Sequence, residues 1–153
     1  MTSRGLGVDV LPHRPPMRLV EEIVDLVPGE SARGLRVTHP DDWYFQGHFP
    51  DDPVVPAIVL VELLAQTGGI AAASTAREPE AARTLRVAAV GPFKFPGGAR
   101  PRQLLDARAR VVGRLGGIVK IEGEVLADGA RVAIGSVTLA HVPARSDPSA
   151  RRR

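Results

Sequence analysis

Two residues suited to acid–base chemistry stand fourteen positions apart in contrasting settings. His48 lies in the loop 47–50, between a glycine and a proline, and Glu62 lies inside an unbroken apolar stretch. A lone carboxylate in apolar surroundings costs free energy unless it is paired or protonated. Glu62 is therefore a candidate functional residue, and His48 is its candidate partner in proton transfer.

The helix around Glu62 is the strongest secondary-structure signal in the chain. Pro56 opens it, since a proline at the first helical position sacrifices no hydrogen bond, and the pattern continues over residues 57–74. Apolar residues occupy every side, which predicts a buried core helix. Gln66 follows Glu62 by one turn on the same face, so its amide can donate a hydrogen bond that orients the carboxylate.

The start of this helix offers a third chemical group. The free backbone N–H of Ala57 and the helix dipole favour developing negative charge, such as that on a thioester carbonyl oxygen. A base, an acid and an oxyanion site together form the set needed for proton abstraction next to a carbonyl. Gly47 joins Ala57 and Gln66 as an orienting residue. The residues expected to contact substrate are Phe49, Pro50, Pro56 and Phe95.

The remaining pattern predicts a small antiparallel sheet. Strand-like runs cover residues 17–27, 32–38, 85–95, 103–112, 118–126 and 131–141, and glycine turns separate several of them. The loop 39–56 is too long for a plain connector and is expected to carry function. We predict an α+β fold with the sheet wrapped around one long central helix. Its exposed edges predict pairing with a second copy.

Composition excludes several classes of protein. The 153-residue chain is long enough for one domain, and it has no cysteine, which rules out disulfides and thiolate chemistry and favours a reducing compartment. No signal peptide is visible, so we expect a cytoplasmic protein. Glu62, Gln66 and a glycine pair interrupt the apolar helix, which argues against a membrane span. No histidine pair has metal-ligand spacing.

The net charge of +3 comes from one end of the chain. Residues 143–153 contain four arginines and one aspartate, and the rest of the chain has equal numbers of basic and acidic side chains. A basic tail after a neutral body predicts a disordered end. Nucleic-acid binding would require basic residues interleaved with aromatics on a folded face, and we do not expect it.

Four motifs occur in order: LPHR at 11–14, FQGHFP at 45–50, PVVP at 53–56 and VELLAQ at 61–66. In sequence and spacing they resemble the FabZ-type 3-hydroxyacyl-acyl-carrier-protein dehydratases of the hotdog superfamily. The likeness continues through the FKF segment and the closing strands, and it covers a predicted domain at 11–142. Residues 1–10 and 143–153 lie outside it, as a flexible arm and the basic tail.

The resemblance implies a hotdog fold and a homodimer or trimer of dimers, with His48 of one protomer facing Glu62 of the other. The implied hydro-lyase reaction converts a (3R)-hydroxyacyl thioester, carried on acyl carrier protein, to the trans-2-enoyl thioester. His48 would remove the C2 proton, Glu62 would protonate the departing hydroxyl, and the Ala57 N–H would polarise the carbonyl. No metal or redox cofactor is implied. The acid role of Glu62 predicts that burial raises its pKa.

Three departures from the family pattern stand near the site. Ala57 replaces the usual glycine, and Pro15-Pro16 follow LPHR where an aromatic gate residue is common. Asp51-Asp52 place negative charge at the mouth of the site, which would repel an acidic carrier unless it is offset by Arg100, Arg102 or Lys94.

Two other functions are compatible with the sequence. One is a hotdog acyl-thioesterase, in which a carboxylate near the helix activates water; such enzymes mostly do without His48. The other is a non-catalytic acyl-binding subunit that supports an active partner, which the changes at Ala57 and Pro15 favour. The motifs do not specify the acyl-chain length, its branching or the lipid pathway.

Overall fold

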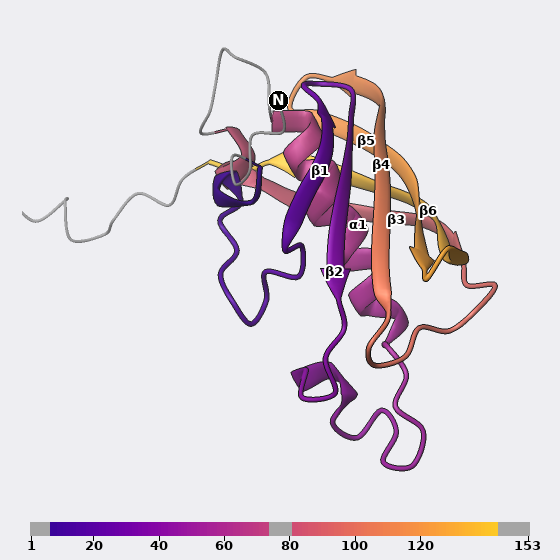
Figure 1. The fold of residues 1–153 in the computed structure, drawn as a ribbon. Coiled ribbons are helices and arrows are strands. Elements are labelled where there is room, and N and C mark those ends of the chain that lie inside the picture. The colour runs from indigo at the N-terminus through magenta and orange to yellow at the C-terminus, as the bar shows by residue number, and fades with distance from the viewer. Residues whose placement is uncertain (1–6, 74–80, 144–153) are drawn as a thin grey trace, which may run out of the picture.

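The computed structural model describes residues 7–73 and 81–143, where six strands form one antiparallel sheet around a single α-helix (Figure 1). The spatial order of the strands is β1-β2-β4-β5-β6-β3. The predicted α+β arrangement is confirmed. The elements are α1 (Ala57–Ala73), β1 (Glu22–Val27), β2 (Ser31–Val37), β3 (Leu85–Lys94), β4 (Leu104–Leu115), β5 (Ile118–Ala127) and β6 (Ala130–His141).

Helix α1 is the centre of the core, as its apolar sequence predicts. Every residue from Leu63 to its end at Ala73 is buried, and these side chains join the buried residues of the sheet in one cluster. Gly68 allows the sheet to approach closely, because a Cβ at this position would lie 2.6 Å from Cγ2 of Ile121 on β5. The helix is therefore packed closely against the strands. Its less buried side chains near the start, such as Glu62, are held on a fixed backbone.

Tight turns join the neighbouring strands. Asp128 and Gly129 have φ angles of 46° and 84° between β5 and β6, and Gly116 has a φ of 59° between β4 and β5. Positive φ at two successive residues suits the right-handed twist of a two-residue hairpin. The glycine turns predicted from the sequence are found at both places.

The first strand is shorter than the predicted range 17–27. β1 begins at Glu22, because the backbone N–H groups of Leu19 and Val20 donate to Oε1 of Gln66 on α1. The alternating pattern of residues 17–21 reflects a segment bound to the helix. Leu19 and Val20 are nevertheless completely or almost completely buried.

The N-terminal segment is partly packed onto the domain. Val8–Val10 form a 3-10 helix, and Val8 joins the core cluster, although the sequence places it in the flexible arm. Residues 1–6, the predicted last helical residue Ser74 and residues 144–153 of the predicted basic tail 143–153 lie outside the described residues.

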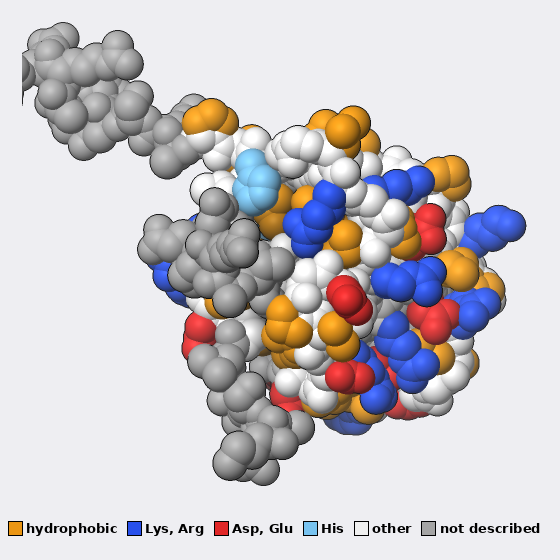
Figure 2. All heavy atoms as spheres, turned by 90° about the horizontal axis from the view of Figure 1, so that it is seen from above, with side chains coloured by type: hydrophobic (Ala, Val, Ile, Leu, Met, Phe, Trp, Pro, Cys, Tyr) orange, Lys and Arg blue, Asp and Glu red, His pale blue; other side chains and the backbone are white. Residues whose placement is uncertain are grey.

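The β3 edge of the sheet is exposed and largely apolar. Residues 86–90 are all exposed, and Val87 and Val90 have exposed fractions of 44% and 55%. An unpaired apolar edge can pair with another strand, since its backbone N–H and C=O groups are free on one side. The face seen in Figure 2 has basic and acidic side chains interspersed among apolar ones.

Candidate active site

Glu62 is held by two donors that meet at one of its oxygens. Nε2 of Gln66, one turn further along α1, donates to Oε1 at 2.9 Å. Nε2 of His13, from the segment before β1, lies 3.3 Å from the same oxygen. The predicted orienting role of Gln66 rests on this observed contact. From its sequence position, His13 is expected to pack and hydrogen-bond near the entrance of the first strand rather than to react, and the structure shows that its contact is with Glu62.

Gln66 is itself fixed at both ends of its amide. Its Oε1 accepts the backbone N–H of Leu19 at 2.9 Å, and its Nε2 donates to the backbone oxygen of Met17 at 2.8 Å. A flipped amide would bring its oxygen against the Met17 oxygen and its NH₂ group against backbone donors. Nε2 is thus the end that faces Glu62.

These contacts contradict the prediction of a raised pKa for Glu62. The hydrogen bond from His13 is the largest influence and lowers the pKa of the carboxyl below its ordinary value of 4.5. Burial acts in the opposite direction, and the hydrogen bond from Gln66 and the positive charge of His13, where that ring is protonated, add to the lowering. The sequence indicates the apolar surroundings of Glu62 and the donor Gln66, but not the contact from His13.

His48 lies in the loop before α1 with one ring nitrogen engaged. Its Nδ1 is 2.9 Å from the backbone oxygen of Val54. A carbonyl oxygen only accepts, so Nδ1 carries the hydrogen and Nε2 of the neutral ring has a free lone pair. The Phe49 ring stacks on the imidazole, with centroids 4.3 Å apart. Gly47, the residue before His48, has a φ of 78°, a backbone conformation that favours glycine.

The start of α1 has a free backbone donor, as predicted. The N–H of Ala57 has no acceptor among the described residues, and Pro56 accepts the first helical bonds from Val59 and Leu60. Ala57 as a residue is exposed, as expected if its N–H is to receive a bound carbonyl oxygen. The neighbouring loop 95–103 is tied to this region by the bond from Val55 N to the Ala99 oxygen at 2.8 Å.

Three of the four residues expected to contact substrate are exposed. Phe49 and Phe95 have exposed fractions of 53% and 43%, and the Phe95 ring stacks on Phe93 with centroids 5.8 Å apart. Pro50 is also exposed, whereas Pro56 is half-buried. Exposed aromatic rings such as these are available to an acyl chain or to a second protomer.

Glu62 opens into a hollow of about 260 Å³ between α1 and the start of β3. The hollow is lined by Leu11, His13, Glu62, Ala65, Gln66, Gly69, Leu85, Arg86, Val87 and Leu139. His48 is not among these lining residues. The described chain therefore does not bring the two predicted catalytic residues together in one hollow.

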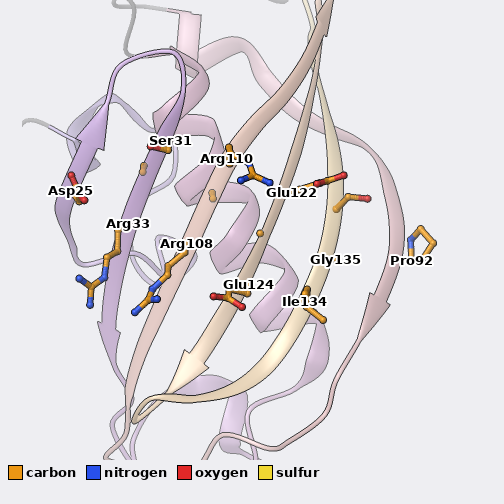
Figure 3. Close-up of a pocket in the computed structure, with 14 residues that line it drawn as sticks. Asp25, Ser31, Arg33, Pro92, Arg108, Arg110, Glu122, Glu124, Ile134 and Gly135 are labelled. Atoms are coloured by element: carbon orange, nitrogen blue, oxygen red, sulfur yellow. The ribbon is translucent and has the colours of Figure 1, made fainter.

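A larger hollow of about 650 Å³ lies on the outer face of the sheet and contains none of the predicted site residues. Figure 3 shows its charged side chains standing on strands β1, β2, β4 and β5. Arg108 is opposite Glu124, and Arg110 is opposite Glu122, in the β4–β5 register. Charges of both signs alternate on this open surface, which is typical of a solvated sheet face.

A mostly buried ionic network that the sequence pattern does not predict supports both sides of the site. Arg36 on β2 donates to the Asp42 carboxylate at 2.9 Å, to the Tyr44 hydroxyl at 3.0 Å and to the Leu19 oxygen at 3.0 Å. The Tyr44 hydroxyl donates to Asp42 at 2.6 Å. Burial raises the pKa of Tyr44, and its hydrogen bond to Asp42 raises it further. The phenol therefore stays a donor.

This network joins the loop of His48 to the support of Glu62. Leu19 binds Arg36 through its oxygen and Gln66 through its N–H. On the other side, Tyr44 precedes Phe45, whose oxygen accepts the His48 N–H at 3.1 Å. The strand pattern alone could not reveal this role of Arg36, because its partners are distant in sequence.

A family model described as a FabA-like domain matches residues 11–136. This chain belongs to the FabA-like family. The resemblance read from the motifs is confirmed, and the match begins at the LPHR motif.

Several curated relatives of this FabA-like chain share one name. A "3-hydroxyacyl-[acyl-carrier-protein] dehydratase FabZ" from Campylobacter hominis is 34% identical over 122 residues, which cover 79% of this chain and 84% of that protein. The FabZ of Caldicellulosiruptor saccharolyticus is 33% identical over 128 residues, which cover 80% and 90%.

Solved structures agree with the predicted hotdog fold of this FabA-like chain. The dehydratase heterocomplex ApeI:P from Xenorhabdus doucetiae has a TM-score of 0.75 at 18% identity and covers 90% of this chain and 91% of that one. The TT0310 protein of Thermus thermophilus has a TM-score of 0.63 at 16% identity, with coverage of 85% and 99%. At these identities the likeness concerns the fold.

Within residues 7–73 and 81–143 there is no group of three or more metal-ligating side chains of the His, Cys, Asp and Glu types. None of the helices in those ranges is long and apolar enough to cross a membrane.

Proposed function

We propose that this chain is a dehydratase that removes water from a (3R)-hydroxyacyl thioester and forms the trans-2-enoyl thioester. The observation that carries the proposal is Glu62, held by His13 and Gln66 at the wall of a largely apolar hollow. A carboxyl placed in this way can give a proton to a hydroxyl group on an acyl chain. The names of the FabZ relatives support the same reaction.

In the proposed reaction, the free Nε2 of His48 takes the proton from C2 of the acyl chain. The electrons of that C–H bond form the C2–C3 double bond, and the C3–O bond breaks as Glu62 protonates the departing hydroxyl. Water leaves, and proton exchange with solvent then restores the neutral imidazole and the protonated carboxyl. The Ala57 N–H, at the positive end of the helix dipole, stabilises charge on the thioester oxygen.

The protonated form of Glu62 belongs to the substrate complex in this proposal. In the free chain, hydrogen bonds lower the pKa of Glu62, while desolvation acts to raise it. An acyl chain that fills the hollow removes more water from the carboxyl and shifts the balance toward the protonated form. In a plot of rate against pH, the basic limb reports loss of the Glu62 proton. This limb should consequently lie at higher pH for kcat than for kcat/KM.

The complete site is proposed to form between two copies of the chain. The exposed β3 edge, with Val87 and Val90, offers a strand for pairing, and Ile58 at the helix start has an exposed fraction of 75%. A second protomer that covers these apolar groups could bring its own His48 to the hollow of Glu62. The molecular mass of the assembly in solution would show whether three such dimers associate.

We propose acyl carrier protein as the donor of the acyl group and the cytoplasm as the compartment. The negative charge of Asp51-Asp52 near the site is an obstacle to an acidic carrier. Arg100 forms an ion pair with Asp52 and so offsets one of the two charges. No cofactor is required, because hydroxyacyl substrate and enoyl product differ only by water.

Mass spectrometry of a short (3R)-hydroxyacyl carrier protein incubated with the enzyme tests the proposal. We expect loss of one water from the acyl group, abolished in both His48→Ala and Glu62→Ala. Release of free carrier, retained in His48→Ala, would instead favour the thioesterase. Tight binding without turnover, and without dependence on either residue, would indicate an acyl-binding subunit.

A further inference from the structure

The unequal environment of the two Glu62 oxygens carries an inference that rests on the proposed function and extends it. Both donors meet at Oε1, with Gln66 at 2.9 Å and His13 at 3.3 Å. No hydrogen bond to Oε2 is found among the described residues. The side chain is 27% exposed, so Oε2 is the oxygen that a substrate can reach without displacing a protein donor.

We propose that His13 is a positioning residue that, as a neutral imidazole, donates from Nε2 to Oε1 of Glu62 and makes Oε2 the proton-carrying oxygen. In the acid form, Oε1 is the carbonyl oxygen and accepts both donors, while Oε2–H points to the substrate hydroxyl. In the carboxylate form, the same two donors stabilise the negative charge. The same two hydrogen bonds thus suit Glu62 both before and after it gives up its proton.

The burial of the other nitrogen of His13 argues for the neutral ring. Nδ1 of His13 is buried and has no hydrogen-bond partner. If the ring were cationic, Nδ1 would carry an N–H with no acceptor, and a buried charged donor without a partner is costly. A vacant lone pair on Nδ1 costs less. The hydrogen of the neutral ring therefore belongs on Nε2, facing Glu62.

Other charged groups around Glu62 are engaged elsewhere. Arg86, which lines the hollow from β3, donates to the backbone oxygens of Arg83 and Leu85. Arg14, next to His13, donates to the oxygens of Leu11 and His13. From the helix itself, only the neutral amide of Gln66 bonds to the carboxyl among the described residues.

Two substitutions of His13 separate hydrogen bonding from charge. His13→Gln keeps an N–H donor and has no cationic form, whereas His13→Leu removes the donor. We expect His13→Gln to keep kcat within a few-fold of the wild type and to leave the Glu62 limb of the pH profile in place. His39→Gln, at an exposed loop position, is the matched control and should change neither.

We expect His13→Leu to lower kcat about 10-fold or more with KM nearly unchanged, because Glu62 loses a positioning contact but the acyl site remains. Loss of a donor to the carboxylate raises the pKa of Glu62, and dehydration needs the protonated form. The basic limb should thus move to higher pH. Thermal unfolding of each variant, followed by circular dichroism, shows whether the fold is retained.

A titration without substrate distinguishes failure of this inference from failure of the proposed function. The ¹³C resonance of the Glu62 carboxyl, assigned with Glu62→Gln, should titrate at higher pH in His13→Leu than in the wild type and His13→Gln. An unchanged titration in a folded His13→Leu would overturn the inference, as would His13→Gln behaving like His13→Leu. If the wild type did not dehydrate the substrate, the proposed function and the proton-carrying role of the Glu62 Oε2 would both be refuted. The titration would still show whether His13 donates to Oε1.

Discussion

Gln66 and Glu62 are joined by a 2.9 Å hydrogen bond across one turn of α1, and the remaining bonds of the Gln66 amide tie the helix to residues 17–20. A single buried side chain therefore positions the candidate acid and anchors a segment far away in the sequence. Substitution at Gln66 should accordingly affect stability and chemistry together.

Gln66→Leu should lower the free energy of unfolding by about 2 kcal/mol or more, because the buried backbone N–H groups of Leu19 and Val20 lose their acceptor. Urea unfolding measures this change. Gln46→Leu, at an exposed loop glutamine, is the matched control and should alter stability by about 0.5 kcal/mol or less. Equal effects of the two substitutions would contradict the role assigned to the Gln66 amide.

Part of this arrangement could be predicted from the sequence and part could not. Glu62 and Gln66 lie four apart in an evident helix, so their shared face follows from helical periodicity. His13 reaches Glu62 only because the chain before β1 folds back onto α1, and single-sequence patterns do not encode that contact. The prediction of a raised pKa for Glu62 was wrong for this reason. The sequence indicates that Glu62 is buried, but it does not indicate that His13 contacts the carboxyl.

The fold was predicted more fully than the site because periodicity and turn residues report local structure directly. The helix start at Pro56 and the hairpin turn at Asp128-Gly129 both have a local physical cause. Arg36 shows the opposite case. It reads as an ordinary polar residue on a strand, yet its ion pair with Asp42 is mostly buried, with side-chain exposures of 11% and 13%.

Asp42 should make stability depend on acid pH. Burial alone would raise its pKa, but hydrogen bonds from Tyr44 and the His39 N–H, with the charge of Arg36, outweigh burial and lower the pKa below 3.8. A lowered folded pKa stabilises the protein above the unfolded value, and that stability is lost as pH falls through the folded pKa. The unfolding free energy should decline below about pH 4.

Asp42→Asn tests this contribution. It removes the charge opposite Arg36, so we expect a loss of about 3 kcal/mol at neutral pH and a shallower decline in acid. Denaturant unfolding between neutral pH and about pH 3 measures both effects. Asp41→Asn, at the exposed neighbouring position, is the matched control. A parallel decline in Asp42→Asn and wild type would show that Asp42 does not contribute to the acid dependence.

Ala57→Gly tests the oxyanion role of the helix start. The Ala57 N–H has no acceptor within residues 7–73 and 81–143, and Ala57 is an exposed residue whose methyl group would limit the approach of a thioester to that N–H. We expect kcat/KM on a carrier-bound substrate to be kept or raised, because glycine leaves the N–H in place and removes the methyl. A large loss in a folded variant would indicate that the methyl shapes the pocket.

Mixed dimers test whether His48 and Glu62 act across a subunit interface. A heterodimer of one His48→Gln chain and one Glu62→Gln chain, isolated through two different tags, would contain one intact cross-interface site. We expect about half of the wild-type activity per dimer, since one of two symmetry-related sites is complete. If both residues acted within one chain, this heterodimer would be inactive.

A second heterodimer, of wild type with the doubly substituted chain, gives the opposite result. Across the interface, each of its sites lacks either His48 or Glu62, so we expect it to be inactive. Within one chain, the wild-type protomer would keep a complete site and about half of the activity. The two heterodimers contain the same substitutions in total, so a difference in their activity cannot come from general damage to the fold. It reports only how the residues are distributed between subunits.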